Sequence, residues 1–225
     1  MIVLTLRVNC PAAESARMPP LTADEIVQHL TEADSTRRIA LKNYSANRLY
    51  LAGNKSLGKS AEVAVVEYYS APGRKQLTVV SERGSPVIVR RVLEKAIEAE
   101  TESSQDGNLN QTRLTRENYR FRLIGSEIID ARPCYILAVT PIVAGKYFVR
   151  GQVWVDQIDF AIIKIEGSPA KNPSFWTRKS HFMRRYEKHG QFWLPSTFDS
   201  DAEVVIFGKS TLRIEYTHYQ VNNLQ

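Results

Sequence analysis

Residues 147–167 of this chain read YFVRGQVWVDQIDFAIIKIEG, and this stretch decides the fold. Two runs rich in valine, isoleucine, phenylalanine and tryptophan lie on either side of the short acidic segment 156–159, DQID. β-Branched and aromatic residues favour the extended backbone of a strand, while aspartate favours a turn. The stretch therefore predicts a long antiparallel hairpin.

Strand-like patterns continue on both sides of this hairpin. The strands that we predict lie near residues 42–52, 61–70, 75–82, 118–129, 133–141, 147–156, 160–167, 179–188, 191–199, 202–207 and 210–220. In the last of them, Leu212, Ile214 and Tyr216 alternate with Arg213 and Glu215. Such alternation is typical of a strand with one dry and one wet face.

Two segments show helical spacing instead. In residues 21–36, Thr22 and Glu25 form a capping box. An apolar stripe at helical spacing follows it, made up of Ile26, Val27, Leu30 and Ala33. A second helix is predicted over residues 87–103. About ten strands and two helices in this order predict an α+β fold, in which one large antiparallel sheet carries the helices on one face.

Length and composition indicate one globular unit. A chain of 225 residues can bury roughly 70% of its unfolded surface, and its 43% of hydrophobic residues is ordinary for a globular protein. We expect a single domain over residues 21–225. Residues 1–20 are expected to be a leader, either the remnant of a secretory signal peptide whose basic start is missing or a disordered segment.

The net charge of +6 suits an anionic partner, either phospholipid headgroups or nucleic acid. The arginine pairs at 37–38, 90–91 and 184–185 are scattered along the chain, which is typical of solvated surface. No motif of a DNA- or RNA-binding protein accompanies them. Nucleic acid is therefore not the partner that we expect.

Residues 53–60, GNKSLGKS, match the phosphate-binding loop pattern of nucleotide-binding enzymes. In such a loop Lys59 would reach the phosphates and Ser60 would hold Mg²⁺. The loop must be followed by a helix, because the helix N-terminus supplies donors and positive charge. Residues 61–70, AEVAVVEYYS, favour a strand. We therefore interpret residues 53–60 as the loop of a hairpin.

Other catalytic patterns are absent from the sequence. The four histidines have no metal-ligand spacing; they are His29, His181, His189 and His218. Asp156 and Asp159 are expected to cap a turn. Cys134 lies in a strand-like segment and is expected to be buried, and whether it pairs with Cys10 is left open. We expect no catalytic residue, no metal and no cofactor.

Five segments of the C-terminal half resemble the bacterial outer-membrane lipoprotein-sorting proteins, which are similar to the carriers LolA and LolB and to the sensor RseB. They are NYRFRLIG (118–125), RPCYILAVTP (132–141), FVRGQVWVD (148–156), FAIIKIEGSPAKNPSFW (160–176) and FWLP (192–195). The likeness extends over about residues 20–221. It implies a strongly curved antiparallel sheet, an unclosed half-barrel whose concave face is covered by helices. It also implies an apolar cavity that shelters acyl chains in the periplasm.

Strand alternation and the helical stripe indicate which side chains would line that cavity. They are Ile26, Leu30, Leu77, Phe121, Leu137, Val153, Phe160, Ile162, Leu212, Ile214 and Tyr216. The aromatic residues expected at its mouth are Phe175, Trp176 and Trp193. Taking a chain of ~14 methylenes out of a membrane costs about 11 kcal/mol, so a large dry surface is needed to offset it.

The function that we predict is a non-enzymatic periplasmic protein that binds acyl chains of lipids or lipoproteins, in outer-membrane lipoprotein sorting or a related envelope function. Its basic surface would dock on a membrane surface or an envelope protein. One alternative is a protein-interaction or envelope-stress sensor module of the same fold without lipid cargo. A less favoured alternative is a nucleotide-binding enzyme that uses residues 53–60.

Overall fold

The computed structural model of the protein describes residues 21–90, 113–143, 145, 147–171, 177–205 and 208–223. Ten strands form its framework. They are β1 (Asn43–Asn54), β2 (Lys59–Ser70), β3 (Arg74–Gly84), β4 (Tyr119–Ile129), β5 (Arg132–Pro141), β6 (Val149–Asp156), β7 (Ile162–Pro169), β8 (Thr177–His189), β9 (Phe192–Val204) and β10 (Gly208–Val221). The two helices are α1 (Ala23–Ala40) and α2 (Pro86–Ile88).

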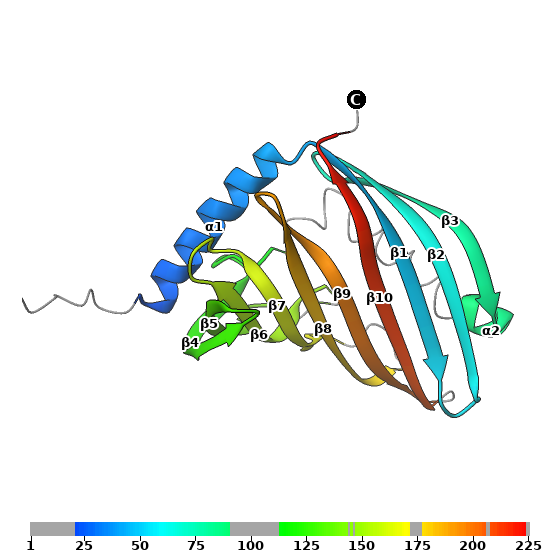
Figure 1. The fold of residues 1–225 in the computed structure, drawn as a ribbon. Helices are drawn as coiled ribbons and strands as arrows, with labels where there is room; N and C mark the ends of the chain where they lie inside the picture. The colour runs from blue at the N-terminus through cyan, green and yellow to red at the C-terminus, as the bar shows by residue number, and fades with distance from the viewer. Residues whose placement is uncertain are drawn as a thin grey trace, which may run out of the picture.

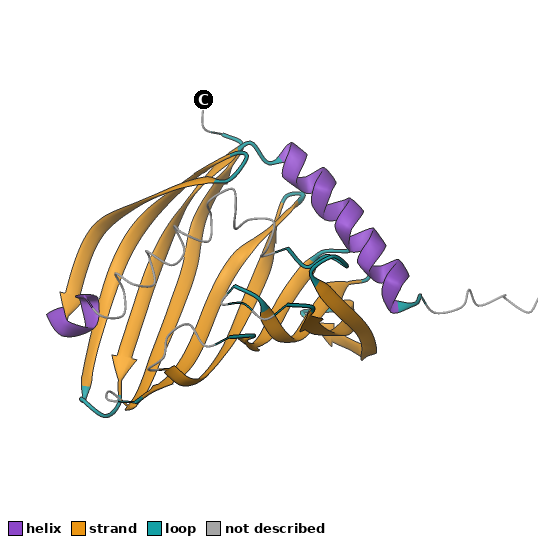
Figure 2. Ribbon diagram, turned by 180° about the vertical axis from the view of Figure 1, so that it is seen from behind, coloured by secondary structure: helices purple, strands orange, loops and turns teal. Residues whose placement is uncertain are grey.

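All ten strands belong to one sheet in the order β3-β2-β1-β10-β9-β8-β7-β6-β5-β4, and each neighbouring pair is antiparallel. The strands β3 and β4 are its two edges, so the sheet does not close into a barrel. Figure 1 shows the sheet bending from β3 round to β4. Figure 2 looks into the concave side, which α1 crosses near the β4 edge. The predicted α+β fold with an unclosed half-barrel is confirmed.

One face of the sheet can be followed from strand to strand, because directly opposed residues of antiparallel neighbours share a face. From β2 to β4 this row consists of Val63, Tyr50, Ile214, Phe198, Arg184, Ile165, Val153, Leu137 and Leu123. We call the face that carries this row the inner face. Every member except Arg184 is apolar or aromatic.

Helix α1 begins where the capping box predicts. The Thr22 hydroxyl accepts from the backbone N–H of Glu25 at 3.2 Å, and the Glu25 carboxylate accepts from the Thr22 N–H at 2.7 Å. The helix ends at Ala40, four residues later than predicted. Its buried residues Ile26, Val27 and Leu30 pack on the inner face of β4, β5 and β6, against a cluster formed by Tyr119, Leu137, Val139, Val153 and Val155.

The second predicted helix starts at Pro86, one residue before the predicted range 87–103. The described part, α2, covers only Pro86–Ile88, and most of the predicted range 87–103 lies outside the described residues. Ile88 and Val89 are buried against the inner face of β1, β2 and β10. The predicted leader, residues 1–20, also lies outside the described residues.

We predicted two separate strands at 191–199 and 202–207. The break between them is wrong, because β9 continues through the polar residues between the two ranges as a single strand. Ser200 pairs with Phe182 on one side and with Leu212 on the other. Asp199 also forms an ion pair with Arg213 on β10, at 3.0 Å. Pairing on both sides outweighs the low strand preference of aspartate.

Candidate functional site

A cavity of about 450 Å³ lies between α1 and the inner face of the sheet. Its walls come from α1, the turn between β2 and β3, the segment before β4, and the strands β7, β8 and β9. We call it the α1 cavity. Its volume lies in the range of small-molecule binding sites.

One wall of the α1 cavity is apolar. Leu30 from α1 faces Ile162 and Ile165 from β7, with Ala161 beside them. Leu30 is a member of the buried cluster under α1, and both isoleucines pack against that cluster. The cavity thus joins the dry surface on which α1 is packed.

The cavity also has a cationic wall. Among the described residues that line the cavity, the basic ones are Arg37, Arg38, Lys75, Arg113 and Arg184, and the acidic one is Asp34. The Asp34 carboxylate lies 3.1 Å from Arg38 Nε and 3.9 Å from Arg113 Nη2. Lys75 also pairs with Glu67, which does not line the cavity. The lining still carries more positive than negative charge, so the cavity is not the purely apolar one that the family resemblance implies.

Arg184 is the least expected of these residues. It occupies an inner-face position on β8, opposite Ile165 of β7 and Phe198 of β9. Its guanidinium lies over the Phe198 ring, 5.2 Å from the centroid. We predicted that the arginine pairs 37–38 and 184–185 lie on the solvated surface. This is wrong for Arg184, which lies on the inner face. It is also wrong for Arg37, whose side chain donates hydrogen bonds to the turn between β6 and β7.

The other residues predicted to line a cavity fall into two clusters on the inner face. Under α1 lie Ile26, Leu137 and Val153, which are buried, with Phe121 and Phe160 partly buried against them. Beside α2 lie Ile214 and Tyr216, which are buried, with Leu77 and Leu212 partly buried. Among the predicted mouth residues, Trp193 borders the α1 cavity, whereas Phe175 and Trp176 lie outside the described residues.

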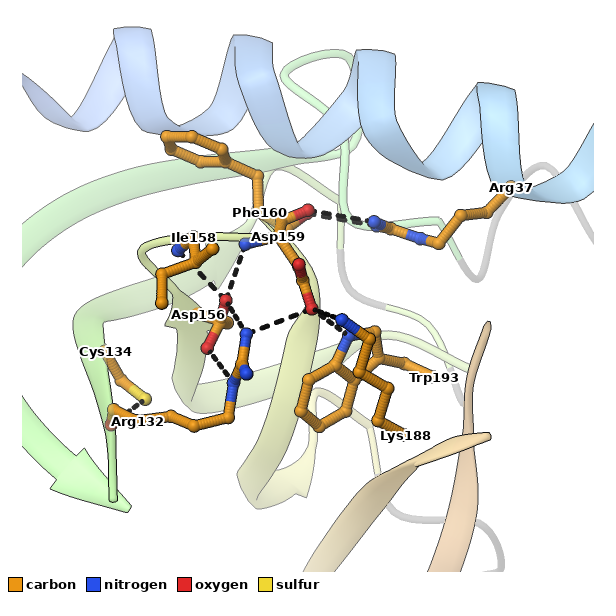
Figure 3. A network of polar contacts seen from close by, with 9 residues as sticks. All are labelled: Arg37, Arg132, Cys134, Asp156, Ile158, Asp159, Phe160, Lys188 and Trp193. Atoms are coloured by element: carbon orange, nitrogen blue, oxygen red, sulfur yellow. Dashed lines mark hydrogen bonds and ion pairs between the residues drawn. The ribbon is translucent and has the colours of Figure 1, made fainter. Parts of the chain in front are cut away.

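The turn between β6 and β7 connects the sheet to α1 (Figure 3). Asp156 accepts hydrogen bonds from the backbone N–H groups of Ile158 and Asp159, at 3.0 and 2.6 Å. Arg37 of α1 donates to the carbonyl oxygens of Asp159 and Phe160, at 2.9 and 3.0 Å. The predicted capping role of Asp156 is confirmed, and the same turn anchors the helix over the cavity.

Three side chains from β5, β8 and β9 hold this turn in place. Arg132 pairs with both carboxylate oxygens of Asp156, at 2.6 and 2.8 Å, and also reaches Asp159 at 3.0 Å. Lys188 and the indole N–H of Trp193 donate to the same oxygen of Asp159, at 2.7 and 3.0 Å. Both carboxylates thus help to position the turn.

These contacts should make the stability of the fold depend on pH in the acidic range. Burial raises the pKa of Asp156, but the hydrogen bonds from Arg132 and from the turn outweigh it, so this pKa is lowered from 3.8. Burial also raises the pKa of Asp159, but the hydrogen bonds from Lys188 and Trp193 outweigh burial, so the pKa of Asp159 is lowered as well. A carboxylate with a lowered folded-state pKa stabilises the fold above its unfolded pKa, and this contribution is lost as pH falls through the folded-state value.

We therefore expect the free energy of unfolding to fall as the pH drops below about 4. Asp156→Asn should be less stable than wild type at pH 7, and the difference should shrink toward pH 2. Urea unfolding at several pH values measures this, with Asp201→Asn, at an exposed position of β9, as the matched control. Parallel curves for wild type and Asp156→Asn would show that the network carries no such linkage.

A second ionic cluster is buried further along the inner face. Arg48 and Glu67 are 2% and 0% exposed, with Arg48 Nε donating to Glu67 Oε2 at 2.7 Å. The Tyr44 hydroxyl donates to Glu67 Oε1 at 3.1 Å, and Lys75 Nζ lies 3.6 Å from that oxygen. The Arg48 guanidinium also lies 4.8 Å from the centroid of the Tyr216 ring. Lys75 therefore links this buried pair to the wall of the α1 cavity.

The phosphate-loop pattern forms the predicted hairpin. Residues 55–58 turn directly from β1 into β2, and Lys59 pairs with Asn54 as the first residue of a strand. The side chain of Asn54 accepts from the Leu57 N–H at 2.8 Å, which closes the turn. No helix follows the loop in this described region, so the geometry of a nucleotide-binding loop is not formed.

Two other openings in the structure are weaker candidates for a binding site. Two openings of about 580 and 610 Å³ lie toward the 53–60 hairpin and are lined mainly by polar residues; Leu212 borders the first.

Within the described residues, no group of three or more histidine, cysteine or acidic side chains is placed to hold a metal ion. Cys134 is buried with a free thiol, and Cys10 lies outside the described residues. No helix in the described part of the chain has the length and apolar character needed to span a bilayer.

No family model and no curated protein matches this chain. Among solved structures, a DUF1329 family protein from Desulfovibrio piger is similar at 15% identity and a TM-score of 0.47, over 91% of this chain and 95% of that one. A putative outer membrane lipoprotein-sorting protein domain from Vibrio parahaemolyticus has 11% identity, a TM-score of 0.47 and coverage of 90% and 95%. A LolA superfamily protein from Nitrosomonas europaea has 15% identity, a TM-score of 0.41 and coverage of 92% and 96%. These likenesses concern the arrangement of the chain alone.

Proposed function

We propose that the protein shelters the acyl chain of a lipid or of a lipid-modified polypeptide on the inner face of its sheet, beneath α1. The observation that carries this proposal is the α1 cavity, whose apolar wall of Leu30, Ile162 and Ile165 continues into the buried cluster under the helix. A binding role of this kind needs no catalytic group, because the surface itself provides the free energy.

The energetics favour a cavity that borders a packed apolar cluster. Each methylene removed from water contributes about 0.8 kcal/mol. A chain leaving a membrane must regain that amount on the protein, and one hydrogen bond provides only about 1 kcal/mol. The apolar wall and the adjoining cluster of α1 offer a contiguous surface of the required kind.

We place this activity in the bacterial envelope, as a periplasmic binding or carrier protein for lipids or lipoproteins. The net charge of +6 supports docking on anionic lipid headgroups or on an acidic envelope partner. A single domain over residues 21–225 is consistent with the one continuous sheet and remains part of the proposal.

The alternative without cargo is a protein-interaction or sensor module. The strand β3 favours it, because β3 is an edge of the described sheet and its Val79 and Val80 are 47% and 64% exposed. Mass spectrometry of gently purified protein separates the two. Co-purified lipid supports the carrier, whereas protein free of lipid that also takes up no fatty acid supports the interaction module.

Filling the α1 cavity tests the proposed site directly. Thr31 lines the cavity from α1, and Thr31→Trp would place an indole in the space of the ligand. We expect the uptake of a fluorescent fatty acid to weaken by roughly tenfold or more, since about two methylenes would lose their place. Thr36→Trp makes the same change at an exposed position of the same helix and should bind like wild type. Equal binding by both variants would rule out this cavity.

A further inference from the structure

We propose that the α1 cavity selects amphiphiles with an anionic end, a carboxylate or a phosphate, and holds that end at its cationic wall. This inference rests on the proposed function and names its ligand class. The chain would lie on Leu30, Ile162 and Ile165, and the anion would lie near Arg38, Arg113 and Arg184.

The charge balance of the cavity supports an anionic ligand. Arg38 and Arg113 share a single carboxylate, that of Asp34, and the approach of Arg113 to it is long at 3.9 Å. Arg113 is partly buried, with 31% of its side chain exposed, and a cation in such a setting is costly unless it is well paired, so its place on the cavity wall favours a ligand of opposite charge.

Arg113 gives a second, independent indication. Its Nε is buried and has no hydrogen-bond partner among the residues that the structure describes. A buried donor without a partner is rare in folded proteins and calls for an explanation. The oxygen of a carboxylate or phosphate in the cavity would satisfy it.

The kind of cation also matters. Arginine presents several donors in one plane, which match the paired oxygens of a carboxylate or phosphate. Arg37 is already engaged with the carbonyl oxygens of Asp159 and Phe160, so it positions α1 and leaves ligand contact to its neighbours. Burial lowers the pKa of Arg37, while the carboxylates of Asp34 and Asp159 act against this.

Pairs of ligands with the same chain test the inference. A fatty acid is compared with the fatty alcohol of equal length, and lysophosphatidic acid with the monoacylglycerol. We expect each anionic ligand to bind about tenfold more tightly than its neutral partner, because a charge-assisted hydrogen bond is stronger than a neutral one. The two arms also show whether carboxylate or phosphate is preferred.

Arginine variants locate the effect. Arg113→Gln should weaken the anionic ligands about tenfold and change the neutral ones less than about twofold. Arg38→Gln, at an exposed position, provides a second test if Arg113→Gln unfolds. Arg120→Gln, exposed on β4 away from the cavity, removes the same charge and should leave both ligand classes unchanged.

The outcomes separate the inference from the proposed function. Equal binding of anionic and neutral ligands, or an equal loss of both in Arg113→Gln, overturns the anion preference while acyl binding stands. Failure of every ligand to bind overturns the proposed function, and this inference with it.

Discussion

Replacing Arg48 with alanine is expected to lower the free energy of unfolding by about 3–5 kcal/mol, one of the two largest effects that we predict for a single change. The variant leaves Glu67, which is fully buried, without its closest cationic partner. Lys75 at 3.6 Å and the hydroxyl of Tyr44 at 3.1 Å would compensate only in part. Urea unfolding monitored by circular dichroism measures the loss.

A paired replacement separates the cost of an isolated charge from the value of the ion pair. Arg48→Met with Glu67→Leu removes both charges and keeps most of the buried volume, and such exchanges are often neutral or stabilising. We expect the double variant to recover most of the stability lost in Arg48→Ala. A loss below about 1 kcal/mol in Arg48→Ala, of the size usual for surface ion pairs, would show that the pair is not buried in solution.

A carboxylate introduced beneath α1 should have the second large effect. Ile26 is fully buried between the helix and the inner face, so Ile26→Asp loses apolar contacts and places a charge among apolar side chains. We expect a loss of about 4 kcal/mol or more, and detachment of α1 before the sheet unfolds. Hydrogen exchange measures this as fast exchange of the α1 amides while those of β1 and β10 stay protected.

The matched control for this change is Gln28→Asp, which adds the same carboxylate at an exposed position two residues further along the helix. It should leave amide exchange and stability close to wild type. Because α1 forms one wall of the α1 cavity, Ile26→Asp should also abolish fatty-acid uptake. Retained protection of α1 in Ile26→Asp would mean that the helix is held by something other than its apolar stripe.

Local sequence signals predicted much of the fold. The capping box of Thr22 and Glu25 identifies the start of α1, because both halves of the motif lie within three residues. Two further predictions hold because their residue types favour an extended backbone: the hairpin over residues 147–167 and the strand over residues 61–70. The break predicted in β9 is wrong, since neighbouring strands and the pair of Asp199 with Arg213 keep a polar stretch extended.

The candidate site was harder to predict, because it depends on register between strands far apart in sequence. Leu30 and Ile162 were predicted from local spacing, and both line the α1 cavity. Its cationic wall combines α1 with residues near positions 75, 113 and 184, and no local pattern connects them. The one available signal was the alternation of β8, which places Arg184 on the same face as Phe182.

The most direct measurement uses a fatty acid that carries a photoreactive diazirine near its methyl end, with the labelled peptides identified by mass spectrometry. If the inner face beneath α1 shelters the chain, the label attaches to peptides that contain Leu30, Ile162 or Ile165, and unlabelled fatty acid removes it. Labelling confined to exposed side chains such as Ile128 and Val80, or labelling that unlabelled ligand does not reduce, would contradict binding at this face.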